Sequence, residues 1–279
     1  MSLLESIVLG IVQGLTEFIP VSSSGHLELV PKFFNWSEPS TGFITFLHFG
    51  TLLALFIYYR KTLIKYFISF FRLLKRSNTL EDNDSLKTML NILIATIPAG
   101  ILGFALSKYI EQLYDAPENA KLATLLTAVA MIFVGVIFIF ANRLFTNKKF
   151  DLEKLTSKKS LIIGIAQAIA IFRGTSRSGI TLLAGQAVGL NRVSAAEFGF
   201  LMSIPITLMA ALFGTIDLIQ TDGNTLSSNM PIYLSGLITS FVFGYFAIKF
   251  MISFLKRRGL RDFGIYRVIF GAIVILTLL

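Results

Sequence analysis

The sequence has no cysteine and little charge. Of its 279 residues, 54% are hydrophobic and 15% are charged, whereas soluble domains usually carry about 25% charged residues. The absence of cysteine excludes a disulfide framework, a thiolate nucleophile and a cysteine-ligated metal site. The scarcity of charge argues against a soluble domain of any size and indicates a chain that lies in a membrane.

Long apolar runs recur along the chain. Each is about 20 residues, enough to cross a hydrocarbon core of about 30 Å. The expected crossings are residues 41–59, 87–107, 121–142, 193–219, 231–255 and 263–279. We therefore predict an all-α, polytopic membrane bundle that forms a single transmembrane domain over residues 1–279.

Two further apolar stretches, residues 1–35 and 160–190, are each interrupted by a polar, glycine- and serine-rich centre. The interruptions fall at residues 20–25 and 174–179. A break exposed to lipid would leave backbone groups without hydrogen bonds, at a cost of several kcal/mol each. Both stretches are therefore predicted to be re-entrant helical hairpins that are shielded by protein or line a wet cavity.

The two interrupted stretches resemble each other. Aligned without gaps at an offset of 154, residues 10–25 and 164–179 are identical at seven of sixteen positions. We interpret this as an internal repeat, with one copy at about 1–142 and the other at about 160–279. Each copy holds one hairpin and three crossings, and this odd number inverts the second copy. Inverted repeats with broken helices build their functional site near the bilayer midplane.

The formal charge of +9 has a simple source. Most lysine and arginine residues lie in the connections 60–87, 143–159, 191–192 and 256–262, and there is no nucleic-acid motif, so we expect no nucleic-acid partner. The positive-inside bias places these connections in the cytoplasm and both termini outside.

The first interruption follows Gln13 and Glu17, which share one helix face. An ionisable group at membrane depth needs a partner, a cation or a wet cavity, although Glu17 could also be a helix-packing carboxyl. A carboxylate beside phosphate oxygens repels them unless a cation intervenes. Glu17 with Gln13 therefore suggests an oxygen-liganded divalent cation, Mg²⁺ or Ca²⁺.

The second interruption has the donors of an anion site. Guanidinium groups suit phosphate oxygens, hydroxyl groups add donors, and glycines allow close approach of the backbone. The predicted phosphate-binding residues are Arg173, Gly174, Ser176, Arg177, Ser178 and Thr181. The alternative is an arginine paired with Glu17 for folding, with serines as helix N-caps.

If the two interruptions meet, the pocket suits phosphoryl transfer, since it combines hydroxyl groups, a carboxylate, a histidine and fixed positive charge. His26 could instead only bond a nearby backbone carbonyl. His48 is equally suited to packing or to the site, and Arg267 is either a phosphate ligand or a buried structural partner.

At these residues the chain resembles the undecaprenyl-diphosphate phosphatases of the bacitracin-resistance type. The resemblance covers nearly the whole chain and rests on residues 13–26, QGLTEFIPVSSSGH, and on residues 174–179, GTSRSG. It implies removal of the terminal phosphate from undecaprenyl diphosphate, a polyprenyl lipid of the bacterial plasma membrane, which recycles the carrier for cell-wall synthesis.

The resemblance also implies roles for single residues. Glu17 and Gln13 match a motif associated with divalent metal, and Ser23 matches a proposed nucleophile with His26 as its acid/base partner. Ser22 is expected to bind the substrate. A metal-bound water or His26 could make the attack instead. The chain departs from the family pattern at Arg173, His48 and Gly199, where proline, glutamine and serine are usual.

A second function class stays open on the sequence alone. Inverted repeats with broken helices are also typical of transporters, so a transporter or flippase of a lipid phosphate is the alternative to the phosphatase. Because the first hairpin begins and ends outside in the expected topology, we expect the site to open to the outer face.

Overall fold

The structure, a computed structural model, describes residues 1–77, 79–145 and 149–278. Its helices are α1 (Leu3–Phe18), α2 (Ser23–Phe34), α3 (Thr41–Tyr58), α4 (Arg60–Leu74), α5 (Leu80–Asp115), α6 (Ala120–Leu144), α7 (Ser157–Ala168), α8 (Arg177–Ala187), α9 (Arg192–Ser228), α10 (Met230–Arg257) and α11 (Arg261–Leu278). Three short 3-10 turns join them: η1 (Pro117–Asn119), η2 (Leu152–Lys154) and η3 (Ile169–Ile171). No β-strand occurs in the described residues, so the all-α prediction is confirmed.

Among the described residues, five helices are long and apolar enough to cross a membrane: α3, α5, α6, α9 and α10. They correspond to the first five expected crossings. The expected sixth crossing corresponds to α11, which does not meet the same standard because its 18 residues include Arg261, Asp262 and Arg267. Its final expected residue, 279, lies outside the described residues.

The outer surface of these helices is apolar. Only 22% of the most apolar window of α5 is buried inside the protein, and the corresponding share in α10 is 33%. Large side chains such as Phe104, Phe133 and Phe213 are exposed over most of their surface. Apolar exposure on this scale would be unfavourable in water, whereas lipid tails solvate it well. The chain is an integral membrane protein.

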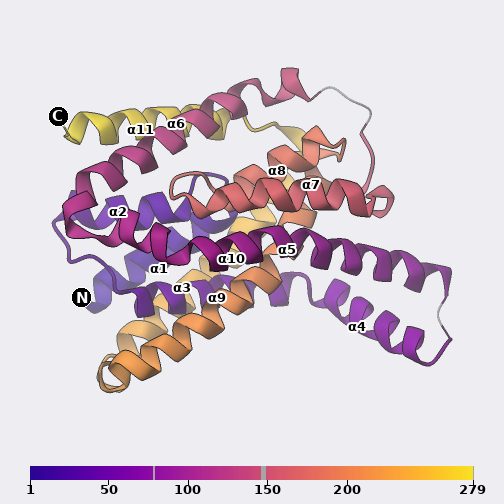
Figure 1. Cartoon of the computed structure of the whole chain (residues 1–279), viewed down its shortest axis with the longest axis horizontal. Coiled ribbons are helices and arrows are strands. Elements are labelled where there is room, and N and C mark those ends of the chain that lie inside the picture. The colour runs from indigo at the N-terminus through magenta and orange to yellow at the C-terminus, as the bar shows by residue number, and fades with distance from the viewer. Residues whose placement is uncertain (78, 146–148, 279) are drawn as a thin grey trace.

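The two expected interruptions are present, and each separates a pair of short helices. The longest of the four, α1, has 16 residues and spans about 24 Å, less than a hydrocarbon core. Figure 1 shows the α1–α2 pair entering from the end that carries both termini, and the α7–α8 pair entering from the opposite end. Their tips meet in the middle of the molecule.

The packing of the pairs is reciprocal. Helix α1 packs mainly against α10, from the second half of the chain, while α7 packs mainly against α5, from the first half. Helices α6 and α11 pack along each other and lie side by side in Figure 1. Each short pair is thus covered by long helices, and this covering shields its broken backbone.

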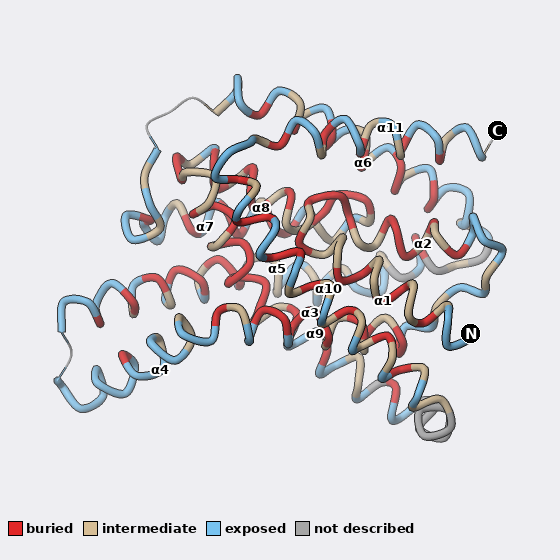
Figure 2. Tube along the Cα trace, turned by 180° about the vertical axis from the view of Figure 1, so that it is seen from behind, coloured by how far each residue is buried: buried red, intermediate tan, exposed pale blue. Residues whose placement is uncertain are grey.

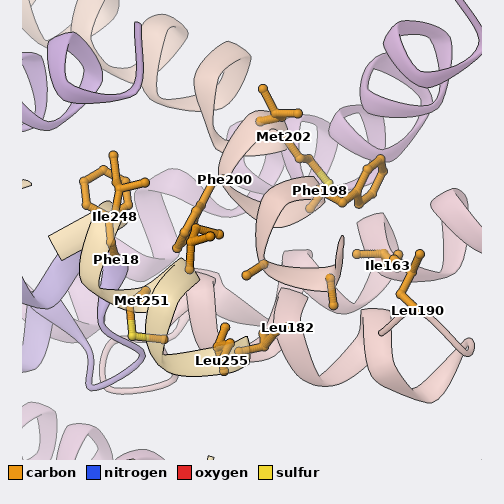
Figure 3. Packing of buried hydrophobic residues seen from close by; sticks show 14 of the residues in the cluster. Phe18, Ile163, Leu182, Leu190, Phe198, Phe200, Met202, Ile248, Met251 and Leu255 are labelled. Carbon is orange, nitrogen blue, oxygen red and sulfur yellow. The ribbon is translucent and has the colours of Figure 1, made fainter. Parts of the chain in front are cut away.

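The buried core surrounds the two hairpin tips. Figure 2 shows buried backbone concentrated at the centre, whereas α4 is largely exposed. In Figure 3, Phe18 of α1 lies with Phe200 of α9 and Ile248 of α10 in one apolar cluster. The rings of Phe18 and Phe200 meet edge to face, with centroids 5.4 Å apart. Because Phe18 follows Glu17, this packing fixes the end of α1 where the polar site begins.

Candidate functional site

The two hairpin tips are built alike. Ser22 and Ser176, which are 154 residues apart, both have positive φ, 78° and 72°. Each caps the helix that follows it, because the hydroxyl of Ser22 accepts from the Gly25 amide and that of Ser176 accepts from the Gly179 amide. Positive φ is costly for a residue with a Cβ and persists only where the surroundings enforce it. The N-termini of α2 and α8, which favour anions, therefore start at fixed points.

Arg267 of α11 holds the two tips together. Its side chain is fully buried, and its guanidinium donates to the carbonyl of Pro20 in the first tip at 3.2 Å and to that of Gly174 in the second at 2.7 Å. It also donates to the carbonyls of Thr175 and of Met131 on α6. These contacts occupy the guanidinium with backbone, so Arg267 is the buried structural partner and not a phosphate ligand.

Glu17 is the centre of the site. Its Oε1 forms an ion pair with Nη2 of Arg177, so the two interruptions do meet. Its Oε2 accepts hydrogen bonds from the Ser23 hydroxyl at 2.7 Å and from Nε2 of Gln13 at 3.1 Å. Nη1 of Arg177 donates to Thr207 of α9 at 2.9 Å. One carboxylate, one guanidinium and one hydroxyl from the two tips are thus in direct contact.

These groups line a cavity of about 290 Å³. Its polar wall contains Glu17, Arg177 and the three serines at residues 22–24, together with Ser176. Its apolar lining comes from α5, α7, η3 and α9, with Ala99, Gly103, Ala168, Ala170, Ile171, Ile206 and Ala210. We call this cavity the first chamber. Its polar residues can bind a charged head group, and its apolar residues can contact an apolar chain.

A second chamber, of about 260 Å³, shares Ser23, Ser24 and His48 with the first. Its other walls include Arg173 and Glu28, and residues 38, 39 and 41 near the start of α3. The Arg173 guanidinium lies 5.0 Å from the centre of the Tyr114 ring. The Nδ1 of His48 lies 2.9 Å from the Ile44 carbonyl. Since a carbonyl only accepts, Nδ1 carries the proton, and neutral His48 keeps Nε2 as an acceptor.

No hydrogen bond joins the described side chains of His26 and Ser23. Its Nδ1 lies 2.7 Å from the Ser22 carbonyl, and its Nε2 lies 2.7 Å from the Tyr266 hydroxyl. The ring stacks on Phe270, with centroids 4.6 Å apart. Because the carbonyl requires a proton on Nδ1, the Nε2 of neutral His26 accepts a hydrogen bond from the Tyr266 hydroxyl. This geometry is the alternative that the sequence left open, a histidine that bonds a backbone carbonyl, and it does not place His26 as the partner of Ser23.

The other predicted phosphate ligands of the second tip form contacts within that tip or with the helix beside it. The Thr181 hydroxyl donates to the Arg177 carbonyl at 3.0 Å, and the hydroxyls of Ser176 and Ser178 lie 3.3 Å apart. Gly174 has φ +87°, and a Cβ there would lie 2.2 Å from the Thr127 carbonyl oxygen. The structure therefore places only Ser176 and Arg177 of this motif in the wall of the first chamber.

A divalent cation such as Mg²⁺ or Ca²⁺ needs several converging oxygen ligands. The described residues contain no group of three or more histidine, aspartate or glutamate side chains that could hold a metal ion. Glu17 already faces a guanidinium, which would repel a cation, and Gln13 directs Nε2 toward it instead of Oε1. Glu17 and Gln13, the two predicted ligands, meet through the Nε2 of Gln13 and not through two oxygens, so these side chains do not fit a resident cation.

The chain is similar to known proteins over almost its whole length. Residues 6–273 match the family described as Bacitracin resistance protein BacA. The chain belongs to this family. A relative from Gemmatimonas aurantiaca, named undecaprenyl-diphosphatase, is 38% identical over 100% of this chain and 98% of its own length. Proteins of the same name from Geotalea daltonii, at 38%, and Alteromonas mediterranea, at 37%, each cover 99% of this chain and 98% of their own. The resemblance expected from the motifs is confirmed.

One departure from the usual BacA pattern has a packing reason. A Cβ at Gly199 would lie 2.5 Å from the Thr181 hydroxyl oxygen. Glycine at this position therefore gives Thr181 the room to bond the start of α8.

Two residues of the chamber were missed by sequence reasoning. Thr207 supports Arg177, and no motif or spacing connects the two. Gln167 lines the first chamber at 2% exposure, and neither its side-chain nitrogen nor its oxygen has a hydrogen-bond partner among the described residues. Its signal was present in the sequence, because it is the repeat equivalent of Gln13 at the offset of 154.

Proposed function

We propose that this protein removes the terminal phosphate from undecaprenyl diphosphate and so returns the lipid carrier for cell-wall synthesis. The observation that carries the proposal is the contact of Ser23, Glu17 and Arg177, supplied by both hairpin tips, within one cavity that also has an apolar wall. The BacA relatives reported above carry the name of this activity.

When the diphosphate enters the cavity, it competes with Glu17 for Arg177. Its oxygens accept the planar guanidinium fork, which suits phosphate as well as it suits a carboxylate. Glu17 then loses its ion-pair partner and retains the Ser23 hydroxyl. The N-termini of α2 and α8, both at the tips, add partial positive charge for the same oxygens.

The Ser23 hydroxyl is the nucleophile of the reaction. Its oxygen forms a bond to the terminal phosphorus while its proton passes to Glu17. The bond from this phosphorus to the bridging oxygen breaks, and the electron pair leaves with the polyprenyl monophosphate. Water then attacks the phosphoserine, inorganic phosphate departs, and Ser23 recovers a proton through Glu17. His26 acts by holding the Ser22 backbone in place, and Tyr266 holds His26.

The prenyl chain lies along the apolar wall of the first chamber. Small residues there, Ala99, Gly103 and Ala210, leave room for isoprene units between α5 and α9. Added Cβ atoms at Gly100 and Gly103 would meet nothing within 4 Å, which supports open space along this face of α5. The lipid tail thus remains between helices, and only the head group reaches the polar tips.

The divalent cation, Mg²⁺ or Ca²⁺, belongs to the substrate in this proposal. It arrives on the diphosphate oxygens, because Glu17 and Gln13 do not form a site of their own. A chelator should therefore lower the rate of phosphate release, and addition of excess Mg²⁺ should restore that rate. The melting temperature of the substrate-free protein should stay the same with and without chelator, since no resident cation is removed. A chelator-induced fall in that temperature would contradict this part of the proposal.

The topology proposed for the bilayer has six crossings, α11 included, and two re-entrant hairpins in an inverted repeat of about 1–142 and 160–279. Reciprocal packing of α1 on α10 and of α7 on α5 supports it, as do the matched Ser22 and Ser176 turns. With the basic connections on the cytoplasmic side of the bacterial plasma membrane, the second chamber opens toward the outer face.

The transporter alternative gains no support, because the relatives reported above are named for phosphate removal. The deciding assay reconstitutes the protein in liposomes and measures inorganic phosphate from long- and short-chain polyprenyl diphosphates. We expect release by the native protein and a loss of at least about 100-fold for Ser23→Ala, Glu17→Gln and Arg177→Gln.

This assay needs evidence that each variant is folded, and a variant outside the site as a control. Each variant should elute as the native protein does, and Lys108→Gln, which removes an exposed charge outside both chambers, should keep native activity. Near-native turnover by the Glu17 and Arg177 variants would contradict the proposed site. Lipid movement without phosphate release would instead favour the transporter.

A further inference from the structure

Gln167 is a buried polar side chain without a partner. It lies near the C-terminus of α7, is 2% exposed, and has no hydrogen-bond partner at Nε2 or Oε1 among the described residues. Nearly all buried amide groups in folded proteins are bonded, because an unsatisfied donor or acceptor loses its water without compensation. A glutamine held in this state therefore indicates a group that the substrate-free protein lacks.

The position of Gln167 identifies that group. It lines the first chamber with Glu17, Arg177 and Ser23. It is also the repeat equivalent of Gln13, which lies at the corresponding place on α1 and uses its Nε2 to bond Glu17. One glutamine of the pair thus serves the carboxylate of the site, while its counterpart enters the same site without a protein partner.

We propose that Gln167 binds the diphosphate of the substrate, with its side-chain NH₂ donating to a phosphate oxygen and its Oε1 accepting from a hydroxyl or a bound water. This inference rests on the proposed function for its ligand. The neighbours cover the carboxamide in the substrate-free protein, so the side chain rotates toward the chamber when phosphate enters, a change common in binding sites. A carboxamide adds hydrogen bonds without charge, which leaves Arg177 as the cation of the site.

The test compares binding and stability in the same variants. Gln167→Leu removes the amide and keeps the bulk, and Gln167→Met is a second variant in case a branched side chain does not fit. The probe is a farnesyl diphosphate analogue in which a methylene group replaces the bridging oxygen, so it cannot be hydrolysed there. We expect the dissociation constant to rise at least about tenfold in both variants. We expect the melting temperature without the analogue to equal or exceed that of the native protein, because no protein hydrogen bond is lost.

The control is Gln186→Leu. Gln186 is equally buried at 2% exposure, but its Nε2 is 3.5 Å from the Leu182 carbonyl, and it lies on α8 outside both chambers. This control should bind the analogue as the native protein does. Native affinity in the Gln167 variants, or their failure to fold, would overturn the inference. Absence of phosphate release by the native protein would refute the proposed function alone, because analogue binding is measured separately.

Discussion

At the scale of single residues, the site depends on a buried ion pair and not on its members separately. The side chain of Glu17 is 8% exposed and that of Arg177 is 22% exposed. Removal of one partner leaves the other charge buried without compensation, which costs about 3–5 kcal/mol in fully buried pairs and less here, because Arg177 retains some solvent. The pair therefore affects both stability and chemistry, and the two effects can be separated.

A double substitution separates them. Glu17→Gln and Arg177→Gln should each lower the free energy of unfolding, whereas the combined variant should be more stable than either one, because no charge remains unpaired. All three should lack phosphatase activity. The measurement is thermal or denaturant unfolding in detergent beside the phosphate assay. Additive losses of stability in the combined variant would show that the two charges do not interact.

Tyr266 tests whether His26 positions the backbone or transfers protons. Tyr266→Phe removes the hydroxyl that donates to Nε2 of His26 and leaves that buried nitrogen unsatisfied, at a cost of about 1–3 kcal/mol. If His26 positions the Ser22 turn, the variant should lose stability and turn over several-fold more slowly, with an unchanged pH profile. The measurements are the melting temperature and kcat against pH. A shifted pH profile at native stability would instead assign proton transfer to His26.

At the scale of elements, the broken helices depend on one glycine in particular. Gly174→Ala should destabilise the second tip strongly, because its φ is +87° and the new Cβ would lie 2.2 Å from the Thr127 carbonyl oxygen. We expect a loss of more than about 2 kcal/mol and no measurable activity. The matched control is Gly100→Ala on α5, where a Cβ meets nothing within 4 Å. The control should match or slightly exceed native stability, as alanine favours helix.

The sequence predicted the elements better than it predicted their contacts. Long apolar runs and the polar interruptions are local signals, and they located five crossings and both breaks. The meeting of Glu17 and Arg177 was predicted from the internal repeat. The start of α5 was missed, because Thr79 and Asp82 form a capping box well before the expected apolar run at residue 87. The partner of His26, Tyr266, lies 240 residues away, and no local pattern encodes that distance. Arg267 bonds carbonyls, which every residue carries, so composition could not reveal its role.

At the scale of the whole molecule, the proposed inverted repeat explains the arrangement. Two copies of one hairpin enter from opposite ends, so the N-termini of α2 and α8 face a common centre from two directions. A single hairpin would present one helix end and either the carboxylate or the guanidinium. The inverted pair presents both charges and both helix ends at one cavity, and Arg267 fixes the distance between them through the carbonyls of the two tips.

This arrangement predicts the sidedness of α11, the helix with the weakest membrane signal. The chain has no native cysteine, so single cysteines can be introduced without interference. A membrane-impermeant maleimide added to intact cells should label Glu118→Cys and Thr277→Cys, and it should label Lys75→Cys and Arg258→Cys only after permeabilisation. Arg258 precedes α11 and Thr277 lies in its last turn, so opposite labelling requires that α11 crosses with Arg267 inside the bilayer. Labelling of both from one side would leave an even number of crossings in the second copy, and the inverted repeat that brings Glu17 to Arg177 would then need a different explanation.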